Sequence, residues 1–144
     1  MAVIPEDEAL RLLADARVGR LATTDAAGVP HVIPFVFVLD GRTLYWAVDG
    51  KPKRSLRLKR LANIEANPGV ELVVDHYEED WSRVWWVRAH GAARILPRGE
   101  ESDRAMRLLA SKYPQNVTEP PSGPAVAIEL SRVSGWEGGR AFES

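Results

Sequence analysis

The sequence predicts a mainly β domain of the α+β class: an antiparallel β-barrel of six short strands, closed or partly closed, with helices inserted after the third and fifth strands. β-Branched and aromatic residues cluster in short runs, and turn residues such as the Asp40-Gly41 dipeptide separate these runs. Two stretches between the runs change to a helical spacing of apolar residues. The 144 residues suffice for one domain of ordinary size, so we expect a single domain over residues 1–144.

The chain is expected to begin with a helix over residues 6–16. Pro5 is tolerated in a first helical turn, and the acidic residues that follow it suit the positive end of a helix dipole. Beyond this helix, β-branched and aromatic residues become frequent, which favours strands. Three consecutive antiparallel strands are predicted, over residues 18–24, 31–39 and 43–48.

A second helix is predicted over residues 55–67, because apolar residues recur at helical spacing and Pro68 follows its end. A strand pair comes next, and we expect Gly91 to bend the longer second strand. These two strands are predicted over residues 70–77 and 84–95, and a third helix and a last strand follow over residues 100–113 and 125–130.

Composition excludes several classes of site. The chain has no cysteine, so it has no disulfide, no thiolate metal site and no cysteine nucleophile. Its histidines, His31, His76 and His90, are too scattered to suggest a metal-ligand cluster. Apolar runs fall short of a membrane span, and the first residues lack the pattern of a signal peptide. We therefore expect a cytoplasmic protein without a catalytic metal or a membrane partner.

One basic segment stands out in a chain whose net charge is -1: residues 51–60 carry six positive charges. Such a concentration indicates either an anionic partner or a well solvated helix face. Nucleic acid is an improbable partner, because the isoelectric point is near 6.3 and acidic runs lie at residues 78–80 and 100–103. Lys51, Lys53 and Arg54 fall in the turn before the helix, whereas Arg57, Lys59 and Arg60 fit a solvated helix face.

Three stretches together resemble the pyridoxamine 5'-phosphate oxidase-like split-barrel family, and within it the actinobacterial branch that uses the deazaflavin coenzyme F420. They are GRLATTDAAGVPHVIPFVFVLDGRTLYWAVDGKPK, RLANIEANPGVELVVDHYEEDW and WWVRAHGAARI. The resemblance is good over residues 18–95 and looser elsewhere. It implies a homodimeric six-stranded split barrel with flavin-type cofactors held between the subunits. The arginine-rich phosphate motif of true pyridoxamine 5'-phosphate oxidases is absent, so that activity is not expected.

The resemblance also implies where the cofactor lies. Its phosphate is expected at the GKPKRS turn, where cations and a helix N-terminus attract anions. Its ring is expected against the strand HVIPFVF, whose residues can equally be ordinary barrel core. His31 in this strand fits a packed or exposed strand histidine better than a catalyst. The expected cofactor contacts are Val32, Ile33, Pro34, Phe35, Lys51, Lys53, Arg54, Ser55, Arg57, Trp86 and Arg88.

The adjacent Trp85 and Trp86 must point to opposite faces of one strand. We expect one in the core and the other at the subunit interface or the cofactor cleft. Arg88 shares a face with Trp86, so it can reach a phosphate or tail carboxylate of the coenzyme or form a surface salt bridge.

The expected function is transfer of a hydride between reduced coenzyme F420 and an unsaturated small molecule. The cofactor carries the electrons, and the protein aligns the ring and excludes water. No residue is indicated as a catalytic acid or base, and the substrate cannot be read from the chain. The alternatives are an FMN-dependent oxidoreductase of the same fold and a cofactor carrier or sensor without turnover.

Overall fold

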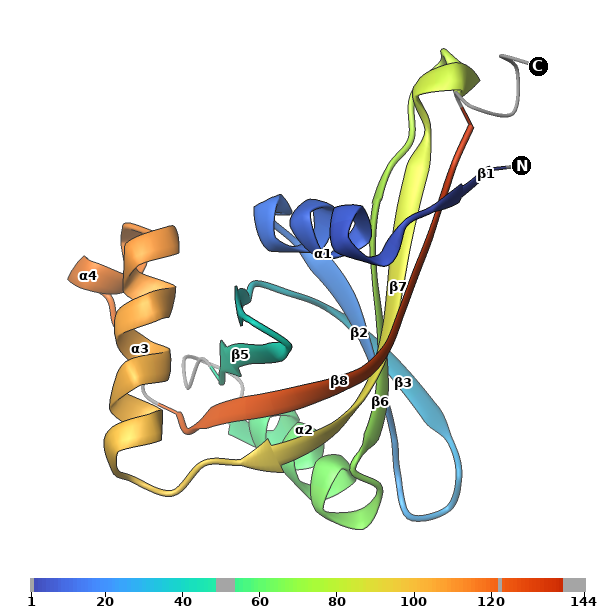
Figure 1. The fold of residues 1–144 in the computed structure, drawn as a ribbon. Coiled ribbons are helices and arrows are strands. Elements are labelled where there is room, and N and C mark those ends of the chain that lie inside the picture. Colours follow the sequence, from blue (N-terminus) through green and yellow to red (C-terminus); the bar gives the residue numbers. More distant parts are fainter. Residues whose placement is uncertain (1, 49–53, 122, 139–144) are drawn as a thin grey trace.

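The computed structural model describes residues 2–48, 54–121 and 123–138, and over residues 54–58 it describes the backbone alone. An antiparallel sheet of eight strands curls around one side, and helices pack on that side (Figure 1). The sheet order is β3-β2-β6-β7-β8-β5-β4, with β1 paired to β8. The strands are β1 (Ala2–Ile4), β2 (Gly19–Thr24), β3 (Pro30–Phe35), β4 (Val38–Asp40), β5 (Thr43–Ala47), β6 (Gly69–His76), β7 (Trp85–Ile95) and β8 (Ala125–Glu137).

The predicted fold class is confirmed: the chain is a mainly antiparallel split barrel with inserted helices, although it has eight described strands rather than six. β1 was not predicted, and β8 continues well past the expected end at Leu130 because its second half pairs with the first half of β7. The helices are α1 (Glu6–Asp15), α2 (Arg54–Ala66), α3 (Glu100–Lys112) and α4 (Gln115–Thr118), and a short 3-10 turn, η1, covers Trp81–Arg83. None of the described helices is long and apolar enough to span a membrane.

The expected strand over residues 31–39 is broken in two, which corrects the prediction of three consecutive paired strands. β3 ends at Phe35, β4 begins at Val38, and the two lie at opposite ends of the sheet order. Pro34 has no N–H to donate to a second neighbour, which suits the edge strand β3. The backbone N–H of Phe37, inside the break, donates to the hydroxyl of Tyr113 at 3.2 Å instead of to a strand. The break lets the chain cross from one edge of the sheet to the other.

The predicted bend at Gly91 is confirmed as a bulge in the β7–β8 pairing between His90 and Gly91. A Cβ atom on Gly91 would lie 2.4 Å from the carbonyl oxygen of Glu129, so only glycine fits there without movement.

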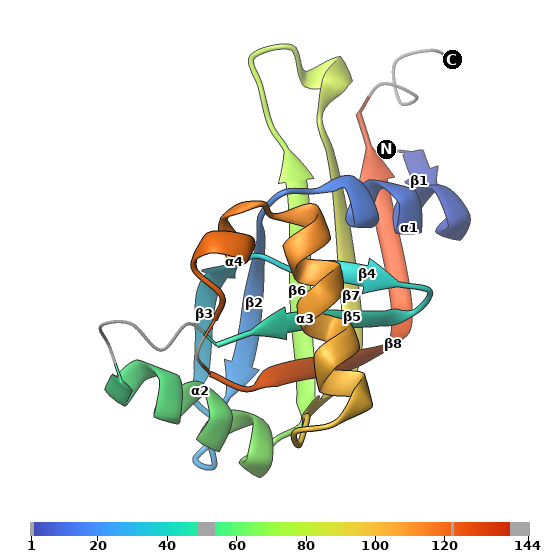
Figure 2. The ribbon, with the colours of Figure 1, turned by 90° about the vertical axis from the view of Figure 1, so that its left-hand side faces the viewer.

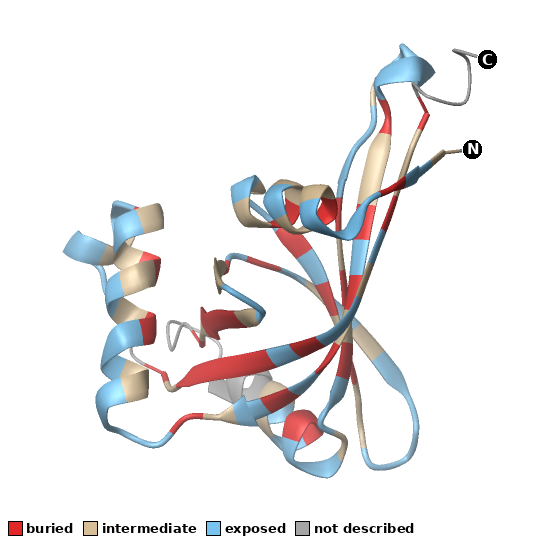
Figure 3. Cartoon of the chain, in the orientation of Figure 1, coloured by how far each residue is buried: buried red, intermediate tan, exposed pale blue. Residues whose placement is uncertain are grey.

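The two faces of the sheet differ sharply in burial. Along β6, Val70, Leu72 and Val74 are buried and point to the side where α1, α2 and α3 lie, which we call the inner face. Residues between them point to the outer face, which none of the described helices covers (Figures 1 and 2). Burial colouring follows this alternation (Figure 3). The barrel core therefore lies between the sheet and its helices.

Trp85 and Trp86 confirm that alternation. Trp85 packs against the buried core, while Trp86 is half-buried on the outer face, where the guanidinium carbon of Arg88 lies 5.5 Å from the centre of its ring. The strand register places Arg88 in one row with Val73 and Ser134 of the neighbouring strands. The predicted shared face of Trp86 and Arg88 is thus confirmed.

Candidate functional site

Two cavities lie side by side between β3 and α2, and both are lined by Arg60. We call them together the β3–α2 groove. The larger has a volume of about 270 Å³ and the smaller about 90 Å³. The larger cavity is lined by Val18, Pro34, Phe35, Val36, Trp46, Ala47 and Arg60, and the smaller by Thr23, His31, Ile33, Lys59, Arg60 and Asn63.

One wall of the groove is aromatic and tightly packed. The ring of Phe35 stacks on that of Phe37 at 4.9 Å and meets Trp46 edge-on at 6.3 Å. Gly19 of β2 lies beneath the phenylalanines, and a Cβ atom there would come within 3.0 Å of the Phe35 ring. The wall is thus apolar and has little room to shift, as a site for a flat ring requires.

The opposite rim is cationic and comes from α2. Lys59 is exposed and Arg60 is half-buried, and neither has an ion-pair partner among the described residues. Asn63, three residues after Arg60, is buried and donates from Nδ2 to Thr23 Oγ1 at 3.2 Å. This bond ties α2 to β2, so the side of the helix that carries Lys59, Arg60 and Asn63 faces the groove.

The end of α2 is held by a second amide. Asn67 Nδ2 donates to the carbonyl oxygen of Asp25 at 2.7 Å, at the turn between β2 and β3. The Asp25 carboxylate in turn accepts the backbone N–H groups of Val29 and Ala27, each at 2.9 Å. These bonds hold the pKa of Asp25 below its ordinary value, and the bond from Val29 has the largest effect.

His31 is oriented by the same carboxylate. Its Nε2 lies 3.4 Å from Asp25 Oδ2, and its ring lines the smaller cavity. The sequence favours a packed or exposed strand histidine over a catalyst, and the structure adds that His31 borders the groove. It can offer a ring nitrogen to a bound molecule there. In the described part of the chain, no three acidic or histidine side chains are grouped to hold a metal ion.

Three of the four residues predicted to form the ring wall line the groove. Pro34 and Phe35 line the larger cavity and Ile33 the smaller. Val32 lines neither cavity; it is 68% exposed and points to the outer face. β3 is an edge strand, so the side chains on both of its sides are accessible. Some of them border the groove and others border the outer face.

The structure describes only part of the predicted phosphate turn. Lys51 and Lys53 lie outside the described residues, as do the side chains of Arg54, Ser55 and Arg57. The backbone shows that α2 begins at Arg54, so the positive end of its dipole lies at the predicted turn.

Several groove residues were not singled out from the sequence: Thr23, Trp46, Ala47 and Asn63. Lys59 and Arg60 fit a solvated helix face in the sequence, and Lys59 is indeed exposed, but both also line the smaller cavity. A polar Asn63 three residues after Arg60, next to the apolar stripe of the helix, was the available signal.

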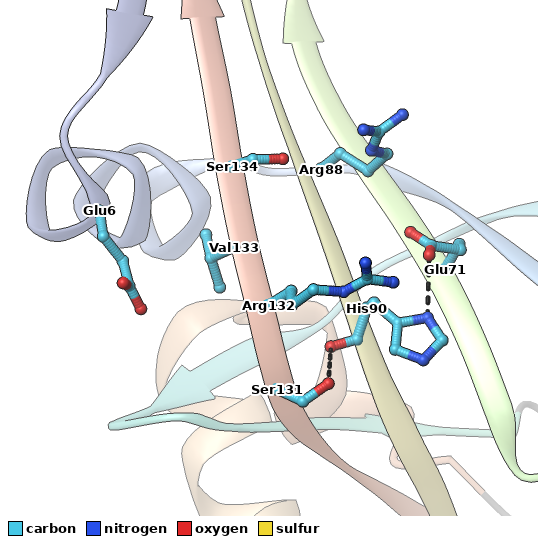
Figure 4. A pocket seen from close by; sticks show the side chains of 8 residues that line it. All are labelled: Glu6, Glu71, Arg88, His90, Ser131, Arg132, Val133 and Ser134. Atoms are coloured by element: carbon cyan, nitrogen blue, oxygen red, sulfur yellow. Dashed lines mark hydrogen bonds and ion pairs between the residues drawn. The ribbon is translucent and has the colours of Figure 1, made fainter.

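A further cavity of about 430 Å³ lies mostly on the outer face, and we call it the outer-face cavity (Figure 4). Some of its polar groups contact one another. His90 Nδ1 lies 2.8 Å from Glu71 Oε1, and Ser131 Oγ donates to the His90 carbonyl oxygen at 3.2 Å. The predicted contact Arg88 belongs here and not in the groove of its own chain. The lining residues are Glu6, Glu71, Arg88, His90, Ser131, Arg132, Val133 and Ser134.

Solved structures share the fold. A conserved hypothetical protein of Mycobacterium tuberculosis superposes with a TM-score of 0.79 at 17% identity, covering 98% of this chain and 89% of that one. A FAD-binding protein of Mesorhizobium loti superposes with a TM-score of 0.70 at 23% identity, covering 93% and 95%. At these identities the likeness concerns the fold.

Sequence comparison gives two further matches. A 5a,11a-dehydrotetracycline/5a,11a-dehydrooxytetracycline reductase of Streptomyces rimosus is 34% identical over 87 residues, which are 60% of this chain and 60% of that protein. The sequence model of the pyridoxamine 5'-phosphate oxidase family matches residues 5–137, which is nearly the whole described chain. The split barrel and this match together establish that the chain belongs to the pyridoxamine 5'-phosphate oxidase family.

Proposed function

We propose that this protein is an oxidoreductase that transfers a hydride between reduced coenzyme F420 and an unsaturated small molecule, with the coenzyme in the β3–α2 groove. The observation that carries the proposal is the meeting of an aromatic wall and a cationic helix in one groove. A flavin or deazaflavin has the matching chemistry, a flat ring joined to an anionic chain. When bound, the coenzyme supplies the hydride.

The residues of the chain have separate tasks in this proposal. Phe35, with Ile33 and Pro34, supports the ring and keeps water from one of its faces. Arg60 and Lys59 attract the anionic chain. Lys51, Lys53, Arg54 and Ser55 at the start of α2 are proposed to hold the first phosphate, and Arg57 a later part of the chain.

The charge pattern supports coenzyme F420 over FMN. FMN ends in one phosphate, so its site needs one compact group of cations. Coenzyme F420 carries a phosphodiester followed by a lactyl and oligoglutamyl tail, and cations spaced along α2 suit that longer anion. The relative in Streptomyces rimosus, named a reductase of dehydrotetracyclines, supports the reductive direction.

The choice is tested by titrating the protein with coenzyme F420, FMN and an F420 analogue that lacks its glutamates, at low and moderate salt. We expect micromolar or tighter binding of coenzyme F420 and weaker binding of FMN. The analogue should lose affinity at low salt, and the loss should shrink as salt screens the tail. Tight binding of FMN with no measurable binding of coenzyme F420 would assign the protein to FMN instead.

Turnover separates an enzyme from a carrier. Reduced coenzyme is mixed with a panel of quinones, enones and tetrapyrroles, and its reoxidation is followed by absorbance. Reoxidation with at least one compound class supports the oxidoreductase, whereas tight binding without reoxidation by any of them supports the carrier.

We also propose that the working unit is a homodimer joined through the outer face. That face carries Trp86 and the exposed Val3 and Val32, and none of the described helices covers it. In such a dimer Val32, Trp86 and Arg88, which point away from their own inner face, would contact the coenzyme of the partner. Sedimentation should give about 32 kDa, twice the chain mass of 16.0 kDa.

A further inference from the structure

We propose that Tyr113, assisted by Lys112, is a positioning residue for the coenzyme: it fixes Phe37 and thereby the aromatic wall of the β3–α2 groove. Neither residue lines the groove. Both lie at the end of α3, far from β3 in sequence, and both contact the break between β3 and β4. The inference rests on the proposed function, because it names what aligns the ring in that site.

Tyr113 binds both backbone groups of Phe37. Its hydroxyl oxygen accepts the Phe37 N–H at 3.2 Å and lies 2.9 Å from the Phe37 carbonyl oxygen. The carbonyl oxygen of Arg17 is also within reach, at 3.0 Å, so the hydroxyl proton is shared between two acceptors. One side chain thus takes the place of the neighbouring strand that Phe37 lacks.

Lys112 holds the other side of the same residue. Its ammonium group lies 4.4 Å from the centre of the Phe37 ring and donates to the carbonyl oxygens of Ala14 and Ala16, at 3.1 and 2.7 Å. These carbonyls are at the end of α1, where the helix dipole favours a cation. Burial lowers the pKa of Lys112 to about 8, so the group is mostly charged at neutral pH.

Phe37 packs directly against the aromatic wall of the groove, so a shift of Phe37 would also displace that wall. Phe37 is fully buried and stacks on Phe35, which lines the groove. On the far side, the backbone of Gly19 sits so close that an added Cβ atom would lie 3.0 Å from Phe35 and 3.2 Å from Phe37. A displacement of Phe37 therefore passes to Phe35 and to the surface on which the ring would lie.

The test compares Tyr113→Phe with Tyr45→Phe. Tyr45 is also buried, and its hydroxyl donates to Glu101 of α3 at 2.9 Å, so both variants remove a hydroxyl that holds α3 to the barrel. Only Tyr113 touches Phe37. We expect both variants to lose a few degrees in melting temperature. Coenzyme binding should weaken about 5- to 20-fold in Tyr113→Phe and less than twofold in Tyr45→Phe.

Hydrogen exchange without coenzyme supplies a second readout. Amides of residues 35–38 should exchange about tenfold faster in Tyr113→Phe than in the wild type or Tyr45→Phe. Lys112→Met keeps an apolar stem but removes the ammonium, and it should weaken coenzyme binding about 2- to 5-fold. It also serves as the test should Tyr113→Phe fold poorly.

The outcomes separate this inference from the proposed function. Equal coenzyme affinities in Tyr113→Phe, Lys112→Met and Tyr45→Phe would overturn the positioning role while leaving the groove as the site. A wild-type protein that binds neither coenzyme F420 nor FMN would overturn the proposed function and the positioning role with it. In that case faster exchange at residues 35–38 would still show that Tyr113 orders the wall.

Discussion

The β3–α2 groove and the outer-face cavity show that size alone does not identify a binding site. The outer-face cavity is the larger, at about 430 Å³ against 270 and 90 Å³. Its walls are mostly polar side chains of an open sheet, and two of them, His90 and Glu71, already pair with each other. The groove is smaller, but its cations stand opposite an aromatic wall, whereas the lining of the outer-face cavity contains no phenylalanine, tyrosine or tryptophan.

The difference follows from what each face is packed against. On the inner face, α2 is fixed to the sheet by Asn63, so side chains from two elements converge on the same space. On the outer face, side chains of neighbouring strands stand in parallel rows that none of the described helices covers (Figure 1). Convergent walls suit a small ligand, whereas an open, partly apolar sheet face suits a second protein surface.

The largest effect is expected from Trp86→Ala on the outer face. Tryptophan is the residue most often found at interface hot spots, and a two-fold dimer would contain Trp86 twice. A loss of about 2.7 kcal/mol corresponds to a roughly 100-fold weaker dimer, measured by sedimentation of the coenzyme-free protein. Trp81→Ala is the matched control, because Trp81 is 71% exposed in η1 and outside the sheet. A wild-type monomer at micromolar concentration contradicts the assignment of this face.

The next effect concerns the start of α2. A charge-assisted bond to phosphate is worth about 1.5 to 3 kcal/mol, so Lys53→Ala or Arg54→Ala should weaken coenzyme binding roughly 10- to 150-fold. Arg57→Ala should cost much less. Arg107→Ala, on the exposed face of α3, removes an arginine far from the groove and from the outer face, and it should leave coenzyme affinity within about twofold. Small and equal losses of coenzyme affinity in all four variants would mean that the basic segment is only a solvated helix face.

A smaller effect is expected from Arg60→Gln, measured by the same titration. Arg60 is half-buried at the junction of the two groove cavities, and a partly screened contact is worth about 1 kcal/mol, or roughly fivefold in affinity. Arg107→Gln on the exposed face of α3 removes the same charge far from the groove. If both variants bind the coenzyme with equal affinity, then Arg60 acts only through the long-range electrostatic field of the protein and not through a contact with the coenzyme.

The smallest effect is one of pH on the helix side of the barrel. Glu101 of α3 accepts two bonds from Arg94, each at 2.7 Å, and one from Tyr45, and these lower the pKa of Glu101 to about 2. A carboxylate with a lowered pKa in the folded state stabilises the fold above its unfolded pKa, near 4.5, and this stabilisation fades as pH falls toward 2.

Because the side chains of this pair are partly exposed, the contribution should be about 1 kcal/mol or less, or at most about 2–4 °C in melting temperature. Glu101→Gln should therefore melt below the wild type at pH 7, and the gap should narrow by pH 3. A gap that stays constant or widens in acid speaks against this ion pair.

Sequence patterns predicted most helices and strands because each depends on neighbours in the chain. Gly91, for example, was read correctly as a bend from its place in a long strand. The break after Phe35 was missed, because the partner of Phe37 is Tyr113, 76 residues away. Strand β1 was missed because three residues give no alternation to recognise, and its pairing with β8 is equally distant.

The candidate site was predictable where it lies on one strand and obscure where two elements meet. Ile33, Pro34 and Phe35 follow from the strand and the family resemblance. Trp46 and Thr23 enter the groove only through the way β5 and β2 are placed around it. Lys59 and Arg60 fit a solvated helix face because runs of charge are common on helix surfaces, and only the packing of α2 on β2 shows that they also border the groove.

The position of β8 bears on how the chain folds. This last described strand pairs with β1, near the first described residues, and with β5 and β7. It therefore connects segments that are far apart in the sequence. Until it docks, those three strands have unpaired edges, which are the surfaces through which partly folded chains aggregate. Contacts between such distant segments also form slowly, because a long loop must close before they are gained. Conditions that delay docking of residues 125–137 should therefore favour inclusion bodies over soluble protein.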